Sequence, residues 1–145
     1  MEPFVNLFGP VDALLAPFVE YVILALVLLN LVTRQLAHRH QVAQASDGAD
    51  AVDRYLPHVA SNVLLVLGAF YYLTITHHAG MVFAILTVGL FVTDFFEFES
   101  RNVEARNDMG LERPKGAIVA SLLVLSYAAY QSLFWLVAGP FGTVV

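Results

Sequence analysis

The stretch that decides the fold is PFVEYVILALVLLNLVTR, from Pro17 to Arg34. Between Glu20 and Arg34 lie thirteen residues whose only polar side chains are those of Tyr21, Asn30 and Thr33. On an α-helix these residues cover about 20 Å. The hydrophobic run also extends further outward, and Arg34 can reach with its guanidinium toward the far surface. Because the hydrocarbon core of a bilayer is about 30 Å thick, we interpret this segment as a membrane-spanning helix.

The composition of the whole chain points the same way. Of its 145 residues, 59 % are hydrophobic and 13 % are charged, whereas about 25 % of residues are charged in soluble proteins. This excludes an ordinary water-soluble globule. The net charge of −5 argues against a nucleic-acid partner, because such proteins need clustered Lys and Arg to neutralise phosphates. The lack of cysteine excludes disulfides, thiolate metal ligands and thiol redox chemistry.

Three more apolar runs follow, and together the four predict an all-α membrane protein. We expect spans at about residues 13–34, 59–77, 80–98 and 117–138, in one domain. Only Ala79–Gly80 separates the second and third runs, so these two helices must be antiparallel neighbours in an up-down bundle. The polar stretches 35–57 and 99–115 are then the two loops at the opposite end. Pro17 lies about one turn into a helix beginning after Asp12, which predicts a kink there or a span that begins near it.

The basic residues indicate how the bundle is oriented. They are Arg34, Arg39, Arg54, Arg101, Arg106, Arg113 and Lys115. All seven fall in or beside the two loops, and the N-terminus, the turn between the second and third spans and the C-terminal tail carry none. Under the positive-inside rule, both loops are cytoplasmic and both termini lie outside. We expect a multi-pass protein of the plasma membrane.

Four polar residues of the spans come to a similar depth near the cytoplasmic side: Asn30, Asn62, Asp94 and Ser121. An unpaired amide in hydrocarbon is costly, so these groups are expected to meet across helices. We interpret them as a hydrogen-bonded layer that fixes the helix register, with Asn30, Asn62 and Ser121 in a structural role. The alternative is an ion or proton site in which Asp94 titrates.

Glu97 is the second carboxylate near this level. It lies three residues after Asp94 on the same helix face, and this spacing allows two carboxylates to bind one cation or share a proton. However, Arg101 is four residues after Glu97 and can pair with it, and Arg34 or Arg54 could reach Asp94. We therefore favour a structural ion-pair cluster over an ion site.

On the outer side, Glu20, His77, His78 and Gln131 come to comparable depth, and Tyr127 lies close to this level. A carboxylate with two imidazoles can bind a transition metal or relay a proton. Consecutive helical residues point about 100° apart, so His77 and His78 cannot both face one ion unless the turn unwinds. We expect polar capping of the outer turn and no metal. The third and fourth spans contain no His, so we expect no haem or other cofactor.

Small residues recur at four-residue spacing along the fourth span. The pairs are Gly116–Ala120, Ala117–Ser121 and Ala128–Ser132. Such pairs let two helix backbones approach closely, either within one bundle or between subunits.

We find no convincing set of catalytic residues. Our leading hypothesis is a non-catalytic integral membrane subunit that self-associates or belongs to a larger membrane complex, with the fourth helix and the arginine-rich 99–115 loop as contact surfaces. The alternative is an oligomeric ion or proton channel that uses Asp94, Glu97 and Glu20. The expected partners are the lipid bilayer and other membrane subunits.

Three sequence features carry a resemblance. They are six Arg against one Lys, the acidic stretch SDGADAVDR at 46–54, and FEFESRNVEARNDMGLERPKGAIVASLLVLSYAAYQ at 96–131. In these features the chain resembles small four-span membrane proteins of haloarchaea of unknown function. The resemblance implies a four-helix membrane fold and brings no known activity or functional residue with it.

Overall fold

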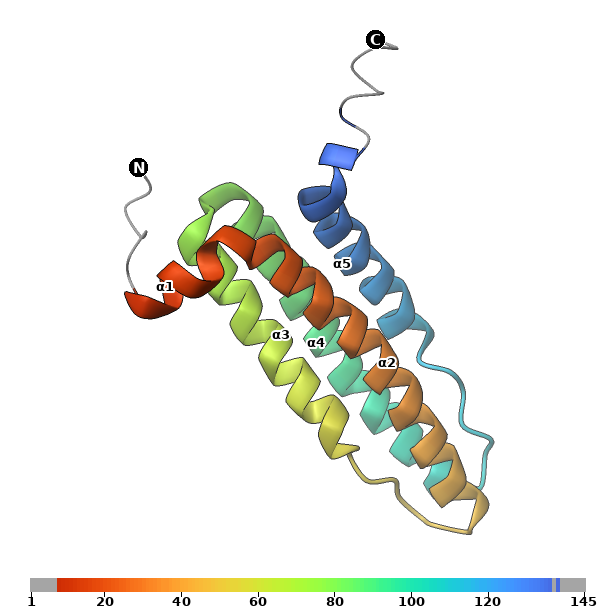
Figure 1. Ribbon diagram of the computed structural model, residues 1–145. Coiled ribbons are helices and arrows are strands. Elements are labelled where there is room, and N and C mark those ends of the chain that lie inside the picture. Colours follow the sequence, from red (N-terminus) through yellow and green to blue (C-terminus); the bar gives the residue numbers. More distant parts are fainter. Residues whose placement is uncertain (1–7, 137, 139–145) are drawn as a thin grey trace.

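The computed structural model describes residues 8–136 and 138, and in this part of the chain all regular secondary structure is helical (Figure 1). The elements are α1 (Pro10–Leu15), the 3-10 turn η1 (Ala16–Phe18), α2 (Val19–Ser46), α3 (Leu56–Ile75), α4 (His77–Arg106) and α5 (Lys115–Leu133). Four helical segments are long and apolar enough to cross a membrane: Pro10–Ser46, which contains α2, and the helices α3, α4 and α5. This confirms the prediction of an all-helical chain with four apolar helices.

The four long helices form an up-down arrangement (Figure 1). Helix α2 packs against α3, α3 against α4, α4 against α5, and α5 against α2. With 28 and 30 residues, α2 and α4 are about 42 and 45 Å long. The 20-residue α3 and the 19-residue α5 are about 30 Å long. The ends of α2 and α4 therefore continue past α3 and α5 at the loop side, as Figure 1 shows.

These continuations put further helical turns inside the polar stretches 35–57 and 99–115. Helix α2 runs to Ser46 and α4 to Arg106, so the connecting segments are 47–55 and 107–114 rather than 35–57 and 99–115. The added turns are rich in helix-forming Gln, Ala, Glu and Arg, and Ala105 packs there with Val52 and Phe98 in a small apolar cluster.

The connection between α3 and α4 is the single residue Thr76, which has an extended backbone. The predicted break at Ala79–Gly80 is wrong in position, because these residues form the first turn of α4. Glycine is nevertheless required at position 80, because the two helices lie very close together there. A Cβ atom on Gly80 would fall against the backbone of Tyr72 and Leu73, so only glycine permits this close approach of the two helices.

Before the N-terminal end of α2, Pro17 interrupts the helix as predicted. It lies in η1, between α1 and α2, because proline has no N–H to donate to the preceding turn. Asp12 is buried in α1, where its carboxylate accepts hydrogen bonds from the Phe8 N–H at 2.9 Å and the Tyr71 hydroxyl at 2.8 Å. These bonds fix α1 to α3.

The interior of the bundle is mainly apolar from the end at the α3–α4 turn to the middle of the helices. The buried apolar side chains include Val19, Ile23, Val27, Leu65, Ala69, Phe83, Leu90, Val124 and Ala128. Large apolar side chains also cover the outward faces of the helices, among them Leu28, Leu64, Ile85 and Leu123. A helix that is apolar on every face is typical of a membrane span.

Candidate functional site

The most concentrated polar group in the bundle surrounds Asp94 of α4, which is 5 % exposed. Its Oδ2 atom accepts a hydrogen bond of 3.0 Å from Asn62 Nδ2 and lies 3.3 Å from His58 Nε2. Its Oδ1 atom pairs with Arg34 Nε at 3.4 Å. One carboxylate of α4 thus receives partners from both α2 and α3.

Arg34 and Asn30 extend the group to all four helices. Arg34 Nη1 donates to the Ser121 hydroxyl of α5 at 2.7 Å, and Ser121 Oγ lies 2.6 Å from the Ala117 carbonyl oxygen. Asn30 Nδ2 donates to Asn62 Oδ1 at 2.8 Å and to Ser61 Oγ at 3.0 Å. We call this set the polar layer, with the members Asn30, Thr33, Arg34, His58, Ser61, Asn62, Asp94 and Ser121. It brings together the four residues that the sequence placed at one depth.

The Thr33–His58 contact gives the polar layer two arrangements of protons. The Thr33 hydroxyl lies 3.1 Å from the Asn30 carbonyl oxygen and 2.8 Å from His58 Nδ1. When its one proton goes to Asn30, His58 Nδ1 must be the donor; when it goes to His58, the neutral ring carries its proton on Nε2, toward Asp94. Both tautomers of the neutral ring therefore fit these heavy-atom positions.

A buried ion pair such as Arg34–Asp94 adds little net stability, because removing both charges from water costs about as much as their attraction returns. Removing one partner alone is different, since it leaves the other charge buried and uncompensated. The polar layer therefore acts on helix register: a sliding helix would separate the charged and amide groups from their partners inside the bundle.

Glu97 does not join the polar layer, and the predicted pair with Arg101 is wrong within the described residues. Its two carboxylate oxygens accept the backbone N–H groups of Gly116 at 3.1 Å and Ala117 at 2.6 Å. These N–H groups have no partner inside α5, and the residue before α5, Pro114, provides no side-chain cap. That missing cap is the signal in the sequence from which an external carboxylate could have been predicted. Arg101 instead donates through Nε to Gln41 Oε1.

At the outer end, Glu20 and Gln131 meet at Tyr72 instead of at the histidines. The Tyr72 hydroxyl donates to Glu20 Oε2 at 3.1 Å and lies 3.5 Å from Gln131 Oε1. His77 and His78 are exposed at the start of α4. Among the residues that the structure describes, no cluster of three His, Asp or Glu side chains is arranged to hold a metal.

Tyr127 lies beside this outer group and packs against Tyr130, with 6.4 Å between ring centroids. The side chains between the outer group and the polar layer are apolar, apart from the buried hydroxyl of Thr87. Apolar packing therefore separates the two polar levels within one chain.

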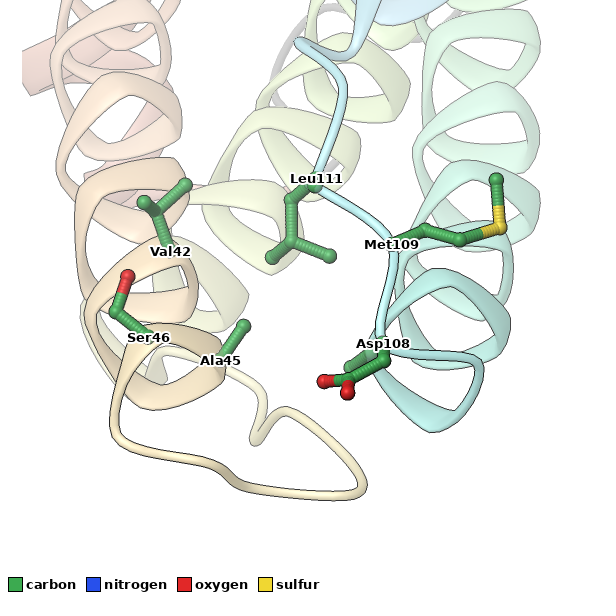
Figure 2. Close-up of a pocket in the computed structure, with 8 residues that line it drawn as sticks. Val42, Ala45, Ser46, Asp108, Met109 and Leu111 are labelled. Atoms are coloured by element: carbon green, nitrogen blue, oxygen red, sulfur yellow. The ribbon is translucent and has the colours of Figure 1, made fainter.

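A cavity of about 250 Å³ lies far from both levels, between the last turns of α2 and the α4–α5 segment. Figure 2 shows Leu111 pointing toward Val42 and Ala45 of α2. Ser46 and Asp108 supply its only hydroxyl and carboxylate groups. This cavity has no arrangement of groups suited to catalysis.

Comparison with known proteins gives a family and no structural relative. No curated protein and no solved structure matches the chain. A family model matches residues 2–145, which include every helix and every member of the polar layer. The chain belongs to the family described as Domain of unknown function (DUF7313).

Proposed function

We propose that the chain is a non-catalytic integral membrane subunit that crosses the plasma membrane four times and associates with a second copy or with other membrane subunits. The loops 47–55 and 107–114 face the cytoplasm, and both termini face outside. The seven basic residues support this orientation, because all of them lie in these loops or in the loop-side parts of the helices. The arginine bias and the acidic 46–54 stretch support a haloarchaeal membrane as its setting.

The single observation that carries the proposal is the polar layer. Its members come from all four long helices, they are buried, and Asp94 has its partners inside the bundle. An enzyme needs a site that a substrate can reach, whereas an interior of this kind holds helices in a fixed register. We therefore assign the polar layer an architectural role.

The association surface follows from what the bundle leaves uncovered. Of the small residues of α5 that suggested a subunit contact, four are buried inside the bundle, Ala117, Ser121, Ala128 and Ser132, whereas Gly116 is exposed and Ala120 is half-buried. The outward side of α3 and α4 instead carries two adjoining apolar cavities of about 180 and 350 Å³, which share Val88. We take this outward groove as the surface on which a neighbouring membrane helix packs, because its lining is apolar throughout.

Filling the groove tests the association. Val88→Trp is expected to weaken association at least tenfold, because the indole occupies the space that the neighbouring helix would use. The matched control is Leu122→Trp, on the outward face of α5, which is expected to leave association unchanged. Light scattering of the protein in lipid nanodiscs over a range of protein-to-lipid ratios measures the effect.

Two outcomes would contradict the proposal. One is a wild-type protein that purifies from native membranes in mild detergent as a lone monomer, with no copurifying chain. The other is proton or ion flux into liposomes that Asp94→Asn abolishes, since this would favour the channel, the second candidate.

One observation favours the channel: a cavity of about 20 Å³ reaches Asp94 and His58 from the loop side. The apolar packing between the two polar levels opposes it.

A further inference from the structure

The interior holds a second buried arginine whose charge is not balanced. Arg101 is 5 % exposed, and its Nε atom donates to the neutral amide of Gln41. Arg34 pairs with Asp94, and Arg54 pairs with Glu99 at 3.7 Å. Within residues 8–136 and 138, no carboxylate lies at ion-pair distance from Arg101. The Arg101 guanidinium is therefore buried without a direct counter-ion in this part of the chain, which is costly.

A small cavity of about 20 Å³ lies beside this charge. Its lining includes Arg101, His58 and Asp94, and Arg54 and Tyr55 line it on the side of the loop that precedes α3. A cavity needs roughly 10–15 Å³ to hold a water molecule, so this one can hold one water molecule or one ion of similar size.

The groups around the cavity can donate hydrogen bonds that nothing in the described part of the chain accepts. Arg101 Nη1 and His58 Nε2 are buried and have no hydrogen-bond partner there. Although His58 Nε2 lies 3.3 Å from Asp94, the contact lacks the alignment of a hydrogen bond. The Asp94 oxygens are already engaged by Arg34 and Asn62. Asp94 also lines the cavity, but its charge is paired with that of Arg34, so the unpartnered Arg101 and His58 nitrogens favour a ligand that accepts hydrogen bonds and carries negative charge.

We propose that this cavity binds a monatomic anion of the halide class, with Arg101 as its principal ligand and His58 as the second donor. Arg54 lies at the loop side of the cavity, where its side chain is 40 % exposed and its guanidinium stands 4.1 Å from the centre of the Phe98 ring. The anion reaches the site from this side. The site lies within one chain, so the proposal holds whether or not the protein associates with other subunits.

Bromide tests the site directly, because it replaces chloride and scatters anomalously. Crystals of the wild-type protein grown or soaked in sodium bromide are expected to show an anomalous peak within hydrogen-bonding distance of Arg101 Nη1. A cavity that shows only a water molecule, with no anomalous peak, would overturn the proposal. This experiment needs no variant and does not depend on how a substitution affects folding.

Thermal unfolding in detergent gives a second measurement. At constant ionic strength, the wild-type melting temperature is expected to be higher in chloride than in gluconate. Arg101→Gln should remove this difference, and Arg106→Gln, an exposed arginine near the end of the same helix, should keep it. An equal chloride effect in both variants would contradict the assignment of Arg101 as the ligand.

Discussion

Replacing Asp94 by alanine is expected to lower the free energy of unfolding by about 3–5 kcal/mol, the cost of breaking a buried ion pair by removing one partner. The substitution leaves the Arg34 guanidinium buried without a counter-charge, at 4 % exposure. It also removes the acceptor of the Asn62 amide. Equilibrium unfolding in mixed micelles of mild detergent and SDS measures the change.

Glu99→Ala is the matched control, because it removes a carboxylate from the same helix. Glu99 pairs with Arg54 at 3.7 Å, and both side chains are largely exposed. Exposed pairs of this kind contribute at most about 1 kcal/mol. If Asp94→Ala destabilised the protein no more than Glu99→Ala does, the polar layer would not hold the helices together.

Gly80→Ala is expected to destabilise the protein by about 3 kcal/mol, at the upper end of the range for overpacking. The added methyl group would lie 2.6 Å from the Leu73 backbone nitrogen and 2.8 Å from the Tyr72 carbonyl carbon. Backbone cannot move aside as a flexible side chain can, so α3 and α4 must separate where Thr76 joins them. The same unfolding measurement reports the loss.

The same substitution at Gly89 separates this effect from helix propensity. A Cβ atom on Gly89 meets nothing within 4 Å, and alanine favours a helix over glycine by about 1 kcal/mol. Gly89→Ala is therefore expected to leave stability unchanged or to raise it slightly. Similar losses at both positions would show that the α3–α4 contact is not as close as described.

The depth of each polar residue could be predicted from the sequence, because an α-helix advances by a constant rise from the loops. The sequence therefore predicts one level for Asn30, Asn62, Asp94 and Ser121. In the structure, hydrogen bonds link Asn30 to Asn62, Asn62 to Asp94, and Arg34 to Ser121. The direction in which a residue faces could not be predicted equally well. Lipid and bundle interior are both apolar, so the pattern on a helix does not say which face turns inward.

Arg34 illustrates this limit. The sequence left two directions open for it, a guanidinium that reaches the membrane surface or a pair with Asp94, and the structure shows the pair with Asp94 and a hydrogen bond to Ser121. Glu20 illustrates it at the outer end, where it meets the buried Tyr72 while His77 and His78 face outward. Glu20 and the two histidines lie at a similar depth along the helices. They do not meet, because the histidines lie on the exposed side of α4.

The small residues of α5 show the same limit for association. Spacing alone identifies a seam of close approach, but it does not distinguish a contact inside the bundle from one between subunits. Ala117, Ser121, Ala128 and Ser132 all face the interior. Ala84 is the one small residue among those that line the groove of α3 and α4 that we propose instead.

Accessibility of single cysteines tests the central claim, that the chain crosses the membrane an even number of times with both basic loops inside. The protein has no cysteine of its own, so each introduced thiol reports one position. In intact cells, a membrane-impermeant maleimide is expected to modify Phe8→Cys but neither Arg39→Cys nor Arg106→Cys, which should react only after permeabilisation. Modification of Arg39→Cys or Arg106→Cys in intact cells would contradict the account.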